Sequence, residues 1–170
     1  RFLHDISVTP AWGMASRIEG ALTFRGYCTP ADLENVRGDV VMCIGTRRAG
    51  QTNAAQRLQA VSAAGAVALI NVDDISFTQE PPRWPLAYAR TVALADAPQP
   101  AATIPVLRMS ADAFLALAEA SGADVGGVFA STATNLPLSP AEFSARLRAD
   151  FATRERSYTS DNVLAVLPGT

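Results

Sequence analysis

The chain has 170 residues, about the size of one domain, and its 49% hydrophobic content is enough to build a buried core. Its net charge of -2 argues against nucleic acid as a partner, because binding phosphates needs a clustered positive field. All fourteen basic residues are arginine, so chemistry that depends on lysine is excluded, and the single histidine, His4, is too little for a histidine-rich metal site.

Short apolar runs along the chain predict a series of strands. These strands are expected at residues 2–8, 18–24, 40–44, 66–72, 104–109, 125–130 and 162–167. A helical turn is expected after Thr29, where proline and an acidic residue follow a capping threonine. Helices are expected at 51–64, ended by Gly65, and at 111–120, capped by Ser110. No apolar run approaches the length of a membrane span, and the first residues have no signal-peptide pattern.

Residues 139–153 carry two conflicting patterns. The segment Ser139-Pro140-Ala141-Glu142 has the form of a capping box, which indicates a helix start. Apolar residues then alternate with charged ones over 145–151, and a period of two indicates a half-exposed strand. We expect a helical turn followed by a strand.

The longest stretch without a clear element runs from residue 75 to 103 and contains five prolines. Loops of this length are often functional. Its aromatic and basic side chains make it a candidate contact for substrate or partner, and the candidate residues are Arg83, Trp84, Tyr88 and Arg90. The equally weighted alternative is a loop that folds Trp84 back onto its own domain.

Two further patterns leave alternatives open. Cys28 and Cys43 are either bonded, as in an oxidising compartment, or two free thiols. The segment 45–52 has the glycine spacing of a phosphate-binding loop, but Gln51 stands where the lysine would be. Without that charge, a strand-to-helix turn that needs glycines is the favoured interpretation.

The order of three segments carries a family resemblance. Val36-Arg37-Gly38-Asp39-Val40-Val41 is followed by the helix-to-strand block of residues 60–73, and then by Ile104-Pro105-Val106. This order resembles the protease-associated (PA) domain, with Asp39 at a position where that family usually has lysine. The resemblance implies a mixed α/β fold of the swivelling β/β/α kind over residues 16–131. That fold is a curved sheet or open barrel with two flanking helices.

The tail adds a second resemblance. Residues 160–169, Ser-Asp-Asn-Val-Leu-Ala-Val-Leu-Pro-Gly, are similar to a strand of zinc-dependent exopeptidases of the aminopeptidase and glutamate carboxypeptidase kind. In that family the strand enters the catalytic domain before its first zinc-binding motif. The resemblance therefore implies that residues 1–15 lead in from a parent catalytic domain. Residues 132–170 would return to that domain and form its first strand.

These resemblances imply a function for the chain as one part of a larger enzyme. The PA domain itself would catalyse nothing and would hold no cofactor, and zinc would belong to the parent catalytic domain. Its expected role is a lid or substrate-access module that contacts the catalytic domain and a peptide or protein substrate. The implied location is secreted or periplasmic. The alternative is a free-standing peptide-binding or sorting module, with a nucleotide-binding domain ranked below both.

Overall fold

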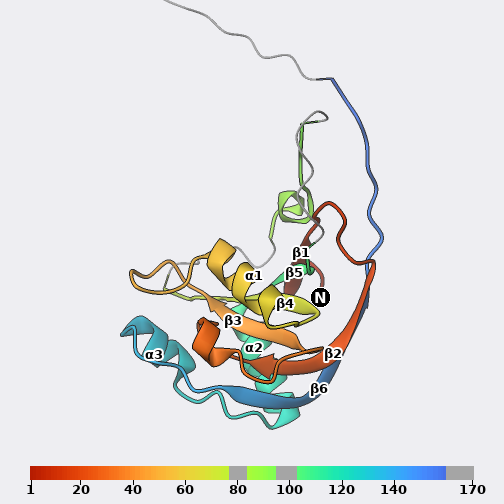
Figure 1. Ribbon diagram of the computed structural model, residues 1–170. Coiled ribbons are helices and arrows are strands. Elements are labelled where there is room, and N and C mark those ends of the chain that lie inside the picture. Colours follow the sequence, from red (N-terminus) through yellow and green to blue (C-terminus); the bar gives the residue numbers. More distant parts are fainter. Residues whose placement is uncertain (77–83, 95–102, 160–170) are drawn as a thin grey trace, which may run out of the picture.

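The computed structural model describes residues 1–76, 84–94 and 103–159. Its strands are β1 (Ile6–Thr9), β2 (Arg17–Phe24), β3 (Val40–Gly45), β4 (Ala68–Asp73), β5 (Val106–Met109) and β6 (Ala141–Asp150). In this part of the chain they form one curled sheet, a half-barrel, in the order β1-β5-β4-β3-β2-β6 (Figure 1). The four central strands are parallel, whereas β1 and β6 pair antiparallel with β5 and β2 at the two edges.

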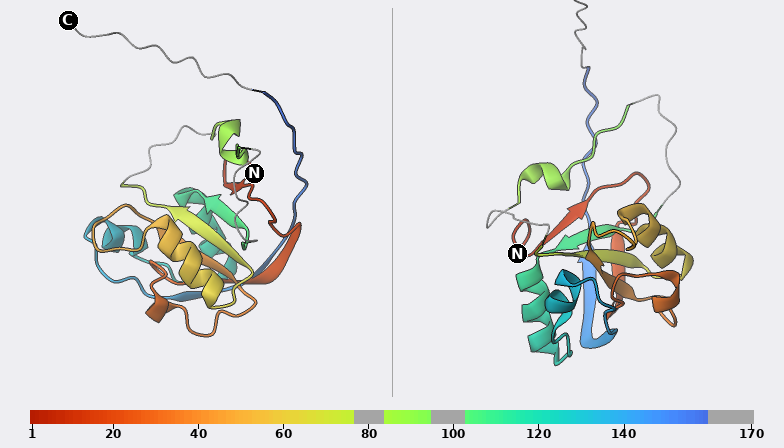
Figure 2. Two further views of the ribbon diagram at one scale, coloured as in Figure 1. Left: turned by 45° about the horizontal axis from the view of Figure 1, so that its top comes forward. Right: turned by 90° about the vertical axis from the view of Figure 1, so that its left-hand side faces the viewer.

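Helices cover both faces of the sheet. Helix α1 (Ala54–Ala63) lies on one face, and α2 (Ala111–Ser121) and α3 (Val128–Ala133) lie on the other (Figure 2). Two short 3-10 turns, η1 (Pro30–Asp32) and η2 (Leu86–Ala89), belong to the connections. A curled sheet with helices on both faces is the mixed α/β architecture that the PA resemblance implies, so the expected fold class is confirmed.

Local capping explains where the two longer helices begin. The Asn53 side chain accepts a hydrogen bond from the backbone N–H of Gln56 (3.0 Å), and the Gln56 side chain accepts one from the N–H of Asn53 (2.9 Å). This reciprocal box starts α1 at residue 54 rather than at the expected residue 51. Ser110 accepts from the N–H of Ala113 (3.2 Å) and starts α2 where the sequence predicts it.

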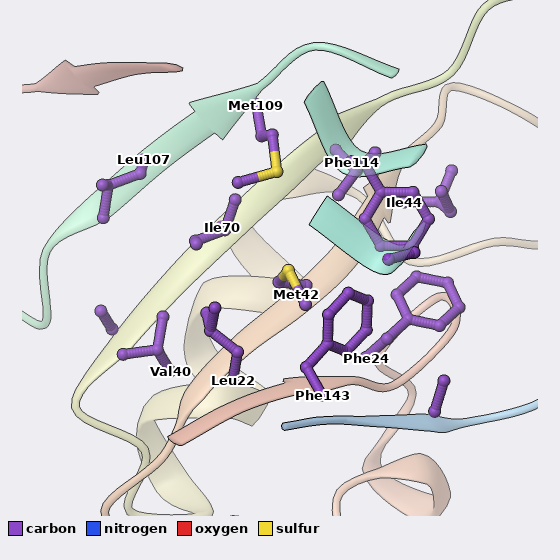
Figure 3. Close-up of a cluster of buried hydrophobic side chains, with 14 of the residues drawn as sticks. Leu22, Phe24, Val40, Met42, Ile44, Ile70, Leu107, Met109, Phe114 and Phe143 are labelled. Atoms are coloured by element: carbon purple, nitrogen blue, oxygen red, sulfur yellow. The ribbon is translucent and has the colours of Figure 1, made fainter. Parts of the chain in front are cut away.

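The larger core fills the space between the sheet and the helices α2 and α3 (Figure 3). Its centre is Phe114, whose ring lies 5.2 Å from the ring of Phe24 and 5.8 Å from that of Phe143, centroid to centroid. Because Phe24 is on β2 and Phe143 on β6, these contacts join the helix to the end of the sheet where β6 lies. Strand β6 is therefore part of the core.

The smaller core lies beneath α1, where Val61 packs with Val41 and Leu69 from the neighbouring strands. The Cys28–Cys43 disulfide belongs to this core, and both cysteines are fully buried. Of the two alternatives for the cysteines, the structure shows the bonded one. The bond ties the turn after β2 to the middle of β3.

Two predicted elements are wrong. Residues 125–130 are not a strand: Gly127 adopts the left-handed conformation (φ 75°) and α3 follows it, with Val128 and Thr132 buried at helical spacing. Periodicity over only six residues does not distinguish a strand from a helix. Here the turn at Gly127 starts a helix. The expected helical turn at 139–142 is also wrong, because Ala141 already pairs with Phe24 of β2.

Other boundaries differ in smaller ways. The expected strand at 2–8 is shorter and shifted, at Ile6–Thr9. Strands β1 and β6 come from the segments expected to flank the PA domain, and both belong to the same sheet as the strands between them. The expected strand at 162–167 lies outside the described residues.

Candidate functional site

The structure describes the side chains of two of the four residues predicted to contact a substrate or partner, Trp84 and Arg90. Arg83 lies outside the described residues, as does the side chain of Tyr88. Trp84 is only 3% exposed, while Arg90 is exposed. The indole of Trp84 packs beneath the guanidinium of Arg108, whose Cζ lies 4.8 Å from the ring centroid. The alternative in which Trp84 folds back onto its own domain is the one that the structure shows.

The segment that begins at Trp84 runs alongside the first residues of the chain. The N–H of Trp84 donates to the carbonyl of Leu3 (2.7 Å), and the hydroxyl of Thr91 donates to the carbonyl of Pro10 (2.5 Å). The second contact lies seven residues after the first on both segments, so residues 84–91 run in the same direction as residues 3–10. Turn η2, within this segment, packs against β1. Covering an edge strand in this way prevents open-ended pairing with other chains.

These two segments carry large exposed apolar side chains. We call them the apolar edge patch: Phe2, Trp12, Leu86, Val92 and Leu94, each between 51% and 80% exposed. Phe2 precedes Leu3 and Val92 follows Thr91, so the hydrogen bonds above hold the chain next to these two members of the patch. Single exposed apolar residues are ordinary, but a group on two bonded segments indicates a contact surface.

Next to Trp84, charged side chains project from β4 and β5 near their carboxyl ends. The Nε of Arg108 donates to Oδ1 of Asp73 (2.6 Å), and both side chains are mostly buried. This ion pair lies on the face of the sheet that α1 covers. It connects the buried Trp84 to the sheet.

Arg57 of α1 is also buried. Its Nε donates to Oδ1 of Asn71 on β4 (3.0 Å), and its Nη1 donates to the carbonyl of Thr52. Burial lowers the pKa of Arg57 because the charged form loses its hydration. In the described part of the chain its hydrogen bonds go to neutral oxygens, so Arg57 fastens the start of α1 to the sheet.

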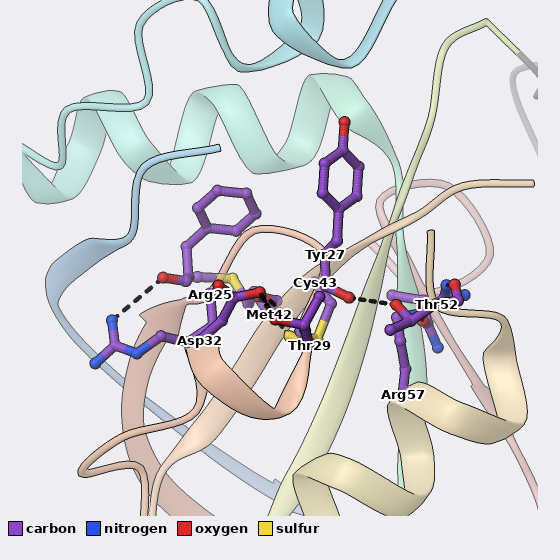
Figure 4. The surroundings of a disulfide bond; sticks show 11 residues. Arg25, Tyr27, Thr29, Asp32, Met42, Cys43, Thr52 and Arg57 are labelled. Carbon is purple, nitrogen blue, oxygen red and sulfur yellow. Dashed lines mark hydrogen bonds between the residues drawn. A yellow bond between two sulfur atoms is a disulfide. The ribbon is translucent and has the colours of Figure 1, made fainter. Parts of the chain in front are cut away.

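The opposite face has a second polar group, around the loop that joins β3 to α1. Oδ1 of Asp74 accepts from the N–H of Ser76 (2.9 Å), and Oδ2 lies 3.6 Å from Nε of Arg48. Nearby, Thr52 donates its hydroxyl to the carbonyl of Tyr27 (2.5 Å; Figure 4). Burial raises the pKa of the Tyr27 phenol. These contacts hold the loop in place.

The same loop does not have the geometry of a phosphate cradle. Gln51 donates from its side chain to Oδ1 of Asn135 (3.0 Å). The N–H of Gln56, in the first turn of α1, is occupied by Asn53. In phosphate loops these helix N–H groups are open to the anion. The turn interpretation of residues 45–52 therefore fits the structure better than the nucleotide interpretation.

Within the described residues, no group of three or more His, Cys, Asp or Glu side chains is placed to hold a metal ion. In the same part of the chain, no helix combines the length and apolarity needed to cross a bilayer.

Sequence reasoning missed Arg57, Asp73 and Arg108, although a signal for each was present. Arg108 interrupts an apolar strand and Asp73 ends another, and charged residues at such positions are usually paired. Arg57 precedes Val61 by one helical turn, on the buried face of α1.

Comparisons with known proteins give matches among solved structures. No protein-family model matches the chain, and no curated protein sequence does. An aminopeptidase from Aneurinibacillus sp. strain AM-1 aligns with 85% of this chain at 13% identity and a TM-score of 0.45. BSAP, a zinc aminopeptidase from Bacillus subtilis, aligns with 85% at 15% identity and a TM-score of 0.40. The chain spans 29% and 28% of the length of these two proteins.

Proposed function

We propose that this chain is a non-catalytic PA-like domain of a larger zinc-dependent aminopeptidase, and that it docks onto the catalytic domain through the apolar edge patch. The observation that carries the proposal is the patch itself. Its members are highly exposed, and hydrogen bonds between residues beside them hold the two segments together. A preformed apolar surface loses little conformational entropy on docking, so its burial is available for binding.

The sequence resemblance supplies the partner. Residues 1–15 are predicted to lead in from the catalytic domain, and Phe2 and Trp12 of the patch belong to that segment. A catalytic domain attached there would lie beside the patch. Zinc and the catalytic carboxylates would be supplied by that domain, and the present domain would shape the access of a peptide substrate.

The location follows from the same proposal. Enzymes of this kind are expected to be secreted or periplasmic, and disulfides persist in such oxidising surroundings. The buried Cys28–Cys43 bond supports this part of the proposal.

The experiment compares two sets of serine substitutions, each made in the isolated chain for the docking measurement and in the full-length enzyme for KM and zinc content. One variant carries Leu86→Ser, Val92→Ser and Leu94→Ser in the patch, and the control carries Leu115→Ser and Leu136→Ser, exposed apolar residues elsewhere. The patch variant should bind the separate catalytic domain about tenfold more weakly or worse, as loss of interface anchors does. Its KM for peptides should change while its zinc content stays constant. Equal docking and equal KM in both variants would refute the proposal.

Catalytic silence of the chain is a second test. Residues 1–170 with added zinc should not hydrolyse an amino-acid anilide. Zinc-dependent turnover that His4→Ala abolishes would place a metal centre in this chain and contradict the proposal.

A groove between η1 and α1 favours one alternative, a peptide-binding module. It has a volume of about 560 Å³, and its walls include Pro30, Leu33, Gln59 and Ala63. If the alternative is correct, labelled peptides should bind the isolated chain, and Ala63→Trp should abolish binding by filling the groove. Ala120→Trp, at an exposed position of α2, is the control. Peptide binding unaffected by Ala63→Trp would exclude this groove as the binding site.

A further inference from the structure

We propose that Asp73, Arg108 and Trp84 form a latch that holds the patch-bearing segment 84–94 on the sheet. The latch is a property of this chain alone, and its effect on docking rests on the function proposed above. Asp73 and Arg108 are positioning residues in this scheme, because they act on the patch through Trp84.

The three side chains are arranged in series. Asp73 ends β4 and Arg108 lies on the adjacent β5, so the sheet fixes both backbones. The carboxylate holds the guanidinium through the 2.6 Å bond to Nε, and the guanidinium in turn lies over the indole of Trp84 at 4.8 Å. The side chain of Asp73 is 12% exposed and that of Arg108 is 26% exposed, so water screens the pair only partly. A planar guanidinium can bond a carboxylate and stack on a ring at once, which an ammonium group cannot do.

Trp84 is the point where the segment enters the fold. Of the side chains described between residues 84 and 94, Trp84 alone is buried. Beyond it, the segment is attached to the first residues of the chain through Trp84 N–H to Leu3 and Thr91 Oγ1 to Pro10. Leu86 and Val92 are 51% and 76% exposed, so each buries less of its surface on attachment than Trp84 does. The indole on Arg108 is therefore the most buried side-chain contact of this segment, and the packing of η2 against β1 adds to it.

The latch has a consequence for binding. Three patch members, Leu86, Val92 and Leu94, lie on the latched segment, while Phe2 and Trp12 lie on the segment beside it. If Trp84 leaves Arg108, these two groups are held together without the buried indole, by the hydrogen bonds to Leu3 and Pro10 and the packing of η2 on β1, so the patch is less well preformed. A partner would then have to order the segment as it binds, which weakens docking.

The test begins with the isolated chain 1–170 carrying Trp12→Phe, so that Trp84 is its single tryptophan. Arg108→Met removes the guanidinium and with it the contacts to Asp73 and Trp84. It should shift Trp84 emission to the red, raise its quenching by acrylamide severalfold and speed chymotrypsin cleavage within 85–94 about tenfold. Arg108→Lys and Asp73→Asn are milder substitutions and should give the same changes with smaller amplitude. They replace Arg108→Met in the test if that variant does not fold. Glu142→Gln is the matched control, because it breaks the Arg25–Glu142 ion pair (2.5 Å) away from Trp84.

Native Trp84 emission and native cleavage in a folded Arg108→Met or Arg108→Lys variant would overturn the latch. A second measurement, docking of the Trp12-containing variants to the catalytic domain, separates this inference from the proposed function. Exposed Trp84 with unchanged docking supports the latch and refutes the docking role of the patch. Unchanged Trp84 with docking lost in the serine variants refutes the latch and supports the docking role.

Discussion

The carbonyl oxygen of Gly38 closes off the space beside Gly20, where a Cβ atom would lie 2.7 Å from it. The backbone nitrogen of Val40 and a methyl group of Val67 would each lie 3.1 Å from this Cβ atom. Real Cβ atoms do not approach a backbone oxygen this closely, so the close approach of these two segments of the chain requires glycine at position 20. Gly20 is on β2, next to the turn that leads into β3.

Gly20→Ala should therefore destabilise the domain, by about 1–3 kcal/mol, because backbone must move to admit the methyl group. Urea unfolding measures the loss. Gly38→Asn is the control, since its Cβ meets nothing within 4 Å and asparagine tolerates the positive φ of 82°. A Gly20→Ala protein within about 0.5 kcal/mol of wild type would show that β2 and the turn are farther apart than described.

Removing the disulfide should be costly. The Cys28–Cys43 bond closes a loop of 15 residues, and loops of this length contribute about 3 kcal/mol by restricting the unfolded chain. Cys28→Ala/Cys43→Ala should lose about this free energy of unfolding in urea. Both sulfurs are buried, so a reductant should act on the native protein only slowly, and thiol labelling should need denaturant. Rapid labelling of the reduced protein without denaturant would contradict the buried position.

Tyr27 should make stability depend on pH at the alkaline end. Burial raises its folded-state pKa above the usual value near 10, so its contribution is complete below about pH 10 and is lost as pH rises through the raised value. The chain has no lysine and its cysteines are bonded, so neither residue type contributes in this pH range. Phenolate absorbance should show one late-titrating tyrosine, absent in Tyr27→Phe. An alkaline fall in stability that is identical in Tyr27→Phe would exclude this cause.

The smaller core makes a further prediction. Leu69 is fully buried beneath α1, and Leu69→Ala should cost about 2–5 kcal/mol, as large-to-small core substitutions do. Leu94→Ala is the control, because its side chain is 80% exposed and should change the unfolding free energy by less than about 0.5 kcal/mol. A loss below that figure for Leu69→Ala would mean that the Leu69 side chain is not buried beneath α1.

Much of the central sheet could be predicted from the sequence. Strands β3 and β4 are short, continuous apolar runs, which is what burial on both faces requires, and each lies close to its predicted position. The apolar positions of the predicted strands and helices predict eight core residues: Val41, Ile44, Leu58, Val61, Leu69, Ile70, Val106 and Leu117. Five of them are fully buried: Val41, Ile44, Val61, Leu69 and Ile70. Leu58, Val106 and Leu117, at the margins of the helices and sheet, are only partly buried.

The features that the sequence did not predict depend on contacts between residues distant in sequence. Nothing near Ala141 reveals that it pairs with Phe24, and the local capping pattern there favours a helix. The position of Trp84 could not be predicted either, because it is set by Arg108 on a strand and by the Leu3 carbonyl at the other end of the chain. The apolar edge patch likewise arises from two segments whose proximity only the fold creates.

The placement of the two edge strands determines the order in which the domain can fold. Ile6 of β1 pairs with Met109, and Arg17 of β2 pairs with Asp150, whereas the four parallel strands and the disulfide join residues much closer in sequence. Long loops cost more entropy to close, so the centre should form first and the edges last. A nascent chain that has reached β5 but not β6 would expose β2 as an open edge, the kind of surface that recruits other chains into aggregates.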